Sequence, residues 1–191
     1  MVIAGKIFDP MYILNPLLSI FILIPLFIIL MISMYRRGRL NFYRFVELLL
    51  FMVYVYFLID LTQFPVFMMK HSEIARIGYG HQYMKINLNL TSVLSQGAFQ
   101  VIGNLVMLLP LSIFVAYLFK VNKFQQNLSV GLSTTFGIEL IQLVLNYFYF
   151  GNRTFDINDL VLNTIGYIIG YGLYKISSKS FNVTKNELAL F

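Results

Sequence analysis

Five long apolar runs, separated by short polar segments, dominate the sequence. They extend over about Tyr12–Tyr35, Phe45–Asp60, Ala98–Phe119, Leu128–Tyr149 and Ile157–Ile176. Charge-poor runs of about 18 residues are typical of helices that cross a membrane. Hydrocarbon offers the backbone no hydrogen-bond partner, and the apolar/polar alternation of a barrel strand is missing. The pattern therefore predicts an all-α integral membrane protein with five transmembrane helices, forming a single polytopic domain over residues 1–191.

Local signals refine the first of these runs and the segment between the second and the third. The pair Asn15-Pro16 predicts where the first helix begins, and Pro25 predicts a kink within it. Residues 66–96 carry lysine, arginine, histidine and glycine too often for a span. We expect this segment to be an extracytoplasmic loop, with or without a short helix on the membrane surface.

The basic residues are unevenly distributed, which predicts the orientation of the chain. Assigning alternate loops to opposite sides places nine Lys and Arg residues on one side and five on the other. The larger group comprises Arg36, Arg37, Arg39, Arg44, Lys120, Lys123, Lys175, Lys179 and Lys185; the smaller comprises Lys6, Lys70, Arg76, Lys85 and Arg153. Since cytoplasmic loops carry an excess of positive charge, we expect the amino terminus outside and the carboxyl terminus in the cytoplasm.

Composition and charge exclude several kinds of site and partner. The chain is 59% hydrophobic and 12% charged, with a net charge of +6. It contains no cysteine, which excludes disulfides and thiolate metal sites. The basic residues form no patch suited to nucleic acid, so no nucleic-acid partner is expected. The amino terminus has no basic segment before its apolar run, and no removable signal peptide is expected.

Costly polar residues gather at the outer ends of the last three predicted spans. Charges and amides inside a bilayer cost a few kcal/mol each, so a group of them indicates a site. The group comprises Asn104, Glu139, Gln142, Asp156, Asp159 and Asn163, with Arg153 in the turn above. Glu47 lies one helical turn from Arg44 near the inner edge, where an ion pair is the simpler interpretation.

Small residues accompany the polar ones. At about 100° per residue, Asp156, Asp159, Asn163, Gly166 and Gly170 share an arc of roughly 80° on one helix. A similar arc on the preceding helix holds Gly131, Thr135, Glu139, Gln142 and Asn146. We expect the helix-packing residues Gly131, Gly166 and Gly170 to bring these two backbones together, since small residues allow membrane helices to approach closely. Both polar arcs would then face one cavity that is open to the outside.

The ordered motif resembles the VanZ-like family, membrane proteins named for an accessory protein of teicoplanin resistance. Its parts in this chain are Asn104, Pro110, Glu139-x-x-Gln142, Arg153-x-x-Asp156-x-x-Asp159-x-x-x-Asn163 and Gly166-x-x-x-Gly170. The resemblance covers a core of about residues 86–175. It implies a role in the bacterial envelope connected with antibiotic response, without a reaction that could be assigned.

Structural and functional interpretations of the motif both remain open. Arg153, Asp156 and Asp159 could form a surface ion pair and an acidic helix start, with Asp156 capping the last helix and both carboxylates near its positive end. Glu139 could be a core side chain bonded to Gln142 and Asn163. Alternatively, Arg153 holds a phosphate or carboxylate, and Glu139 or Asp159 acts in acid–base chemistry. The spacing fits no cation-binding loop, and neither a metal nor a cofactor is expected.

Three functions follow from these interpretations. The first is a VanZ-like protein that binds an amphiphile in an outer-leaflet polar cavity and modifies the response to lipophilic glycopeptides. Its partner would be a membrane lipid, a lipid-linked envelope precursor or a lipoglycopeptide. The second is a transferase or hydrolase acting on a lipid headgroup or a lipid-linked wall precursor, with Glu139 or Asp159 as the catalytic residue. A proton-coupled transporter is third, because the polar residues do not continue to the inner face.

Overall fold

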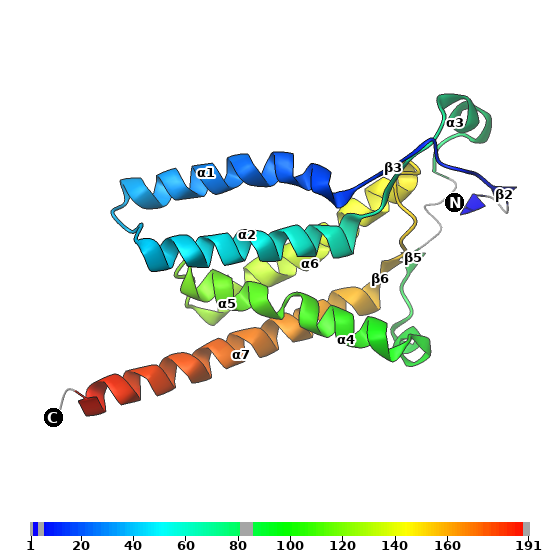
Figure 1. The fold of residues 1–191 in the computed structure, drawn as a ribbon. Coiled ribbons are helices and arrows are strands. Elements are labelled where there is room, and N and C mark those ends of the chain that lie inside the picture. Colours follow the sequence, from blue (N-terminus) through cyan, green and yellow to red (C-terminus); the bar gives the residue numbers. More distant parts are fainter. Residues whose placement is uncertain (1, 4–5, 81–85, 189–191) are drawn as a thin grey trace. The chain divides into compact units, whose positions relative to one another are not determined.

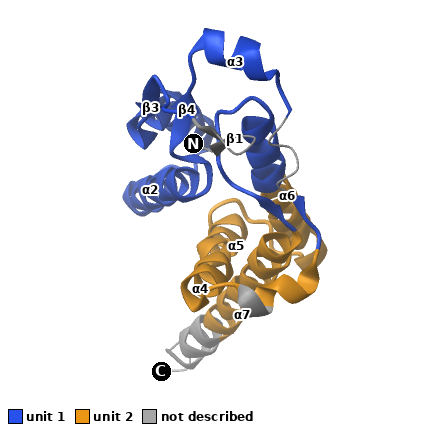
Figure 2. Ribbon diagram, turned by 90° about the vertical axis from the view of Figure 1, so that its right-hand side faces the viewer, with its two compact units in different colours: residues 1–88, 137–156 blue, residues 89–136, 157–191 orange. Residues whose placement is uncertain are grey.

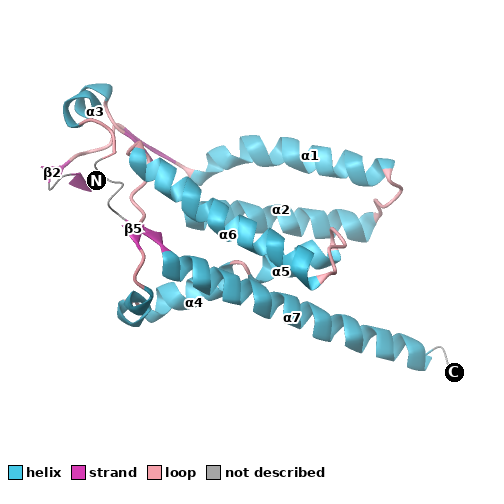
Figure 3. Ribbon diagram, turned by 180° about the vertical axis from the view of Figure 1, so that it is seen from behind, coloured by secondary structure: helices cyan, strands magenta, loops and turns pink. Residues whose placement is uncertain are grey.

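The protein is mainly helical, and the computed structural model describes residues 2–3, 6–80 and 86–188 (Figure 1). The helices are α1 (Ile20–Arg36), α2 (Phe42–Gln63), α3 (His71–Ile77), α4 (Ala98–Met107), α5 (Leu109–Tyr117), α6 (Phe124–Tyr147) and α7 (Ile157–Leu188). Two 3-10 turns are η1 (Pro16–Ser19) and η2 (Leu90–Ser95). The strands are β1 (Val2–Ile3), β2 (Lys6–Ile7), β3 (Tyr12–Leu14), β4 (Val66–Met68), β5 (Ile86–Asn87) and β6 (Phe155–Asp156), and Figure 3 shows how short they are beside the helices.

Four helical stretches of the described chain are long and apolar enough to cross a membrane. They are Pro16–Arg36, Phe42–Gln63, Ala98–Tyr117 and Phe124–Tyr147, and they correspond to the first four predicted spans. The helix α7 begins at Ile157, as predicted, but is not among these four. Its first turns carry Asn158, Asp159 and Asn163, which lower its mean hydropathy. A fifth span and the orientation of the termini therefore stay predictions.

The chain divides into two compact units, each described here by itself (Figure 2). The first contains residues 1–88 and 137–156, and the second contains residues 89–136 and 157–191. The division falls within α6, between Phe136 and Gly137, and again where β6 meets α7. Residues 81–85, including His81 and Lys85 of the predicted extracytoplasmic loop 66–96, lie outside the described residues.

The first unit starts from the pair α1 and α2, which lie side by side in Figure 1. The predicted start of the first helix is confirmed: Asn15 accepts a hydrogen bond from the backbone N–H of Leu17 at 3.0 Å, and Pro16 follows as the first helical residue. Residues 12–14, however, form β3 rather than the beginning of the span. This strand pairs antiparallel with β4, so backbone groups that a helix would satisfy internally are satisfied by residues 66–68.

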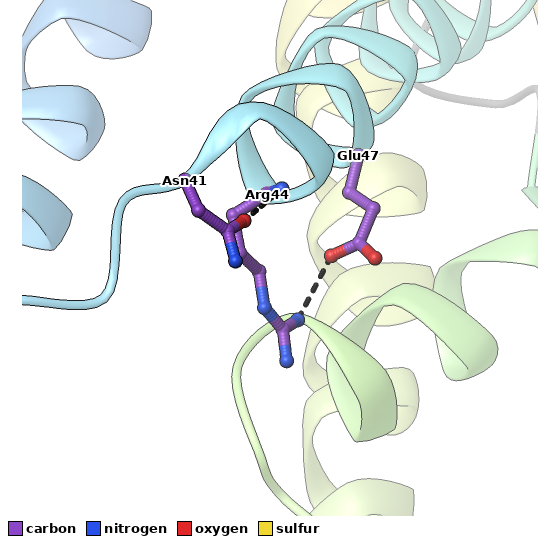
Figure 4. Close-up of polar contacts among 3 residues, drawn as sticks. All are labelled: Asn41, Arg44 and Glu47. Carbon is purple, nitrogen blue, oxygen red and sulfur yellow. Dashed lines mark hydrogen bonds and ion pairs between the residues drawn. The ribbon is translucent and has the colours of Figure 1, made fainter.

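Helix α2 has a polar start (Figure 4). The Asn41 side chain accepts a hydrogen bond from the backbone N–H of Arg44 at 2.8 Å, which caps the helix. One turn further on, the Arg44 guanidinium meets the Glu47 carboxylate at 2.8 Å. The predicted ion pair at this edge is confirmed.

The loop after α2 packs on the turn that ends α6. Tyr149 lies in the left-handed region (φ 61°) and closes this turn. Its fully buried ring contacts Met69 and Ile74 of the loop, and its hydroxyl donates to the carbonyl of Gly78 at 2.7 Å. Residues 66–80 of the predicted extracytoplasmic loop are therefore anchored to the turn after α6, and they contain the short helix α3.

The second unit packs α4 and α5 along α7. The predicted third span is interrupted at Leu108, where α4 ends, and Pro110 lies in the first turn of α5. Gly166 and Gly170 of α7 are buried at this contact. A side chain at either would collide with the backbone carbonyl of Leu105 or Leu109, respectively. The glycines are thus the reason that α7 can lie against α4 and α5.

The predicted partner of this glycine pair was wrong. We expected Gly166 and Gly170 to face Gly131, but they face the carbonyls of α4 and α5. Gly131 instead accommodates the ring of Tyr167, which is 1% exposed. Helical periodicity placed the glycines on one face correctly, but it does not specify which neighbouring helix that face meets.

Apolar side chains cover the outside of α1. Phe21, Ile22 and Ile29 are 77%, 73% and 62% exposed, whereas Leu23 is the one buried residue of this helix. An aqueous protein rarely exposes so continuous an apolar surface. This exposure fits a helix surrounded by lipid.

Candidate functional site

The seven residues of the predicted site are distributed over both compact units. Glu139, Gln142, Arg153 and Asp156 belong to the first unit, and Asn104, Asp159 and Asn163 belong to the second. Within the first unit, the structure joins Glu139 to Asp156 and places Gln142 and Arg153 on one cavity. Within the second unit, it joins Asn104 to Asp159. A single cavity that contains all seven stays a prediction.

In the first unit, Glu139 is joined to the strand β6. Its side chain is 1% exposed, and Oε2 accepts a hydrogen bond from the backbone N–H of Asp156 at 3.2 Å. Asp156 is also buried, and its Oδ2 accepts from the side-chain amide of Asn87 at 3.0 Å. Asn87 and Asp156 face each other in the parallel β5–β6 pair. The buried carboxylate of Glu139 therefore stabilises β6, the segment that leads into α7.

Gln142 and Arg153 satisfy the carboxyl end of α2. The last carbonyls of a helix have no partner within the helix and attract cations and donors. Gln142 Nε2 donates to the carbonyl of Thr62 at 2.8 Å, and Arg153 Nη2 donates to that of Phe64 at 3.2 Å. Within the described chain, Arg153 makes no ion pair with Asp156.

The turn that carries Arg153 is held by Asn146. The Asn146 side chain is fully buried; its Nδ2 donates to the carbonyl of Arg153, and its Oδ1 accepts from the backbone N–H of Arg153 at 3.2 Å. This two-way pairing fixes the backbone of Arg153 while the side chain remains exposed. Among the described residues, the guanidinium uses one donor, and its other N–H groups are available to a further acceptor.

A cavity of about 260 Å³ lies at this place in the first unit. The end of α2, the strand β4, the last turns of α6 and the turn after α6 all line it. The lining residues are Thr62, Gln63, Pro65, Phe67, Gln142, Leu145, Asn146, Gly151, Asn152 and Arg153. Of the predicted site residues in this unit, Gln142 and Arg153 line the cavity, and Glu139 and Asp156 do not.

Two lining residues at the end of α2 were missed from the sequence. Thr62 is 3% exposed, and its hydroxyl donates to the carbonyl of Leu58 at 2.7 Å. Gln63 Nε2 donates to the Thr62 hydroxyl at 3.3 Å, and its Oε1 is a buried acceptor without a hydrogen-bond partner in the described part of the chain. The sequence signal was the polar pair at the end of an apolar run, directly before Phe64-Pro65.

The polar residues of the second unit tie the start of α7 to its neighbours. Asn104 Nδ2 donates to Asp159 Oδ1 at 2.5 Å. Asn158, which was also missed, donates to the carbonyl of Asn89 at 3.0 Å and to the Ser92 hydroxyl at 2.7 Å. These are interhelical bonds of the kind that hold membrane helices together.

Asn163 differs from the other amides of this unit. It is 1% exposed, and its Oδ1 has no hydrogen-bond partner among the described residues. Such a buried acceptor costs about 1–3 kcal/mol unless another group or a water molecule supplies a donor. Over the described residues, no group of three or more His, Cys, Asp or Glu side chains converges to hold a metal ion.

Comparison with known proteins agrees with the order of these motifs. The family model described as VanZ/LLP1 matches residues 45–178, which include the expected core of 86–175 and also α2. The chain is similar to "Protein VanZ" of Enterococcus faecium, with 28% identity over 130 residues that cover 68% of this chain and 75% of that protein. No solved structure matches the chain. The family match extends over most of the chain and confirms the resemblance read from the motif, and this membrane protein belongs to the VanZ/LLP1 family.

Proposed function

We propose that this protein binds the anionic headgroup of an amphiphile in the cavity beside Arg153, and that this binding alters the response of a bacterial cell to lipophilic glycopeptides. The amphiphile would be a membrane lipid or a lipid-linked envelope component in the outer leaflet of the plasma membrane. The observation that carries the proposal is the placement of Arg153, whose backbone is held while its guanidinium lines a cavity.

The polar residues that line the cavity support binding of an anionic group. A guanidinium presents a planar set of N–H groups that matches phosphate and carboxylate oxygens. Gln63 lines the same cavity, and its side-chain amide would be the neighbouring polar group for a ligand held by Arg153. Pockets for drug-sized ligands measure about 300–1,000 Å³. A cavity of about 260 Å³ therefore suits a headgroup rather than a whole amphiphile.

Apolar side chains on the cavity wall support an amphiphile over a free anion. Pro65, Phe67 and Leu145 line the same cavity as Arg153. A headgroup held by Arg153 could continue into its apolar part along these side chains. The family context, in which the relative is a VanZ protein of Enterococcus faecium, connects such binding with the envelope.

The experiment compares Arg153→Gln with Arg76→Gln in cells that depend on the protein for reduced teicoplanin susceptibility. Arg76 is exposed in α3 and does not line the cavity, so its replacement removes the same charge elsewhere in the same unit. At equal protein levels, we expect Arg153→Gln to return susceptibility to that of cells without the protein and Arg76→Gln to leave it unchanged. Equal behaviour of the two variants would refute the assignment.

The enzymatic alternative is separated by the fate of the ligand. Purified protein is incubated with labelled phospholipids and a labelled lipid-linked wall precursor, and bound and free lipids are analysed. Recovery of unchanged lipid, retained by the natural protein and lost from Arg153→Gln, is the expected result. A headgroup-modified product that disappears in Glu139→Gln or Asp159→Asn would instead favour the transferase or hydrolase.

A further inference from the structure

A second cavity, of about 460 Å³, lies in the second unit, and none of its lining residues belongs to the predicted site. Its apolar lining residues are Ile113 of α5 and Leu173 of α7. Its other lining residues include Lys120, Tyr117 and Ser177. The cavity thus combines apolar lining residues with the lysine that follows a membrane-capable helix.

The geometry around this cavity is held by two tyrosines of α7. The hydroxyl of Tyr171 donates to the backbone carbonyl of Asn122 at 2.6 Å, and that of Tyr174 donates to its side-chain Oδ1 at 3.0 Å. These bonds fix the segment after α5 against α7. Lys120 in this segment adopts a left-handed backbone (φ 64°), and its ammonium lies 5.1 Å from the centre of the Tyr117 ring.

The charge around the cavity has one sign. The two segments that build it, residues 109–126 and 160–179, contain no aspartate or glutamate. They carry four lysines, at positions 120, 123, 175 and 179. Juxtamembrane lysines each contribute about 1 kcal/mol to attraction of an anionic lipid surface, and basic pockets between membrane helices bind lipid headgroups.

We propose that this cavity binds an anionic glycerophospholipid. The phosphate lies against the Lys120 ammonium and the Ser177 hydroxyl, and the beginning of an acyl chain lies along Ile113 and Leu173. The cavity volume is within the range that holds a headgroup together with part of a chain. The site is independent of the Arg153 cavity, since the two share no lining residue.

The test measures retention of a labelled phosphatidylglycerol by the full-length protein in nanodiscs of zwitterionic lipid. Lys120→Gln is compared with Lys123→Gln, because Lys123 carries the same charge three residues away and does not line the cavity. We expect Lys120→Gln to weaken binding about tenfold or more, because it removes a charge-assisted contact to the phosphate as well as surface charge. We expect Lys123→Gln, which removes surface charge alone, to weaken binding no more than about fivefold. An equal loss in both variants would show that surface charge alone attracts the lipid and would overturn the proposal.

A second pair of measurements keeps the proposal falsifiable if Lys120→Gln folds poorly. Leu173→Trp fills the apolar side of the cavity without changing charge, and we expect it to lower retention of the labelled lipid. Unchanged retention would overturn the proposal. Soluble glycerol phosphate at the same concentration should not displace the lipid, because it lacks the chain; equal competition would also overturn it.

Discussion

Gly166→Ala tests the contact between α7 and α4 most sharply. In the interior of a helix, alanine is more favourable than glycine by about 1 kcal/mol. Here the added Cβ would overlap the backbone carbonyl of Leu105, which cannot rotate away as a side chain could. Overpacking typically costs about 1–3 kcal/mol, and a backbone obstacle places this site at the upper end. We therefore expect a net loss of about 2 kcal/mol in the free energy of unfolding.

The assay is an SDS titration of the protein in mixed micelles, followed by far-UV circular dichroism. Gly172→Ala is the matched control, since it lies in the same helix and a Cβ there meets no atom within 4 Å. This control should be as stable as the natural protein or more stable by up to about 1 kcal/mol. If both variants had the same stability, α7 would not approach α4 at Leu105 and the described packing would be wrong.

Three further predictions use the same titration. Gln142→Leu should cost about 1–3 kcal/mol, because it leaves a carbonyl at the buried end of α2 without a donor; no loss would contradict the cap. Asn158→Ala should cost about 1–3 kcal/mol because it removes two bonds that hold η2 to α7, and full stability would contradict that role. Asn41→Ala should cost about 1 kcal/mol and Arg44→Gln less than that, since a helix cap outweighs a partly exposed (i, i+3) ion pair; the reverse order would refute this comparison.

Features governed by neighbouring residues were predictable from the sequence. The start of the first helix follows from the Asn15-Pro16 pair, and the end of α2 follows from Phe64-Pro65. Four spans follow from uninterrupted apolar runs. Helix α7 is less apolar than the other four predicted spans because polar residues of the motif lie in its first turns. Its crossing of the membrane therefore stays a prediction.

Features that depend on distant residues were not predictable in this way. Pairing of β3 with β4 joins segments more than fifty positions apart, and local propensity does not specify such a partner. Gly166 and Gly170 share a face by periodicity, but the helix that meets this face is chosen by tertiary packing. Gln63 was overlooked because its role arises only where the end of α2 meets the turn that carries Arg153.

The central claim is that the cavity beside Arg153 holds the headgroup of an anionic amphiphile. A density map of the full-length protein in nanodiscs made from bacterial lipid extract tests it most directly. We predict a phosphate or carboxylate within hydrogen-bond distance of the Arg153 guanidinium, with apolar density continuing along Phe67 and Leu145. Ordered lipid elsewhere around the helices, together with only water in this cavity, would contradict the account.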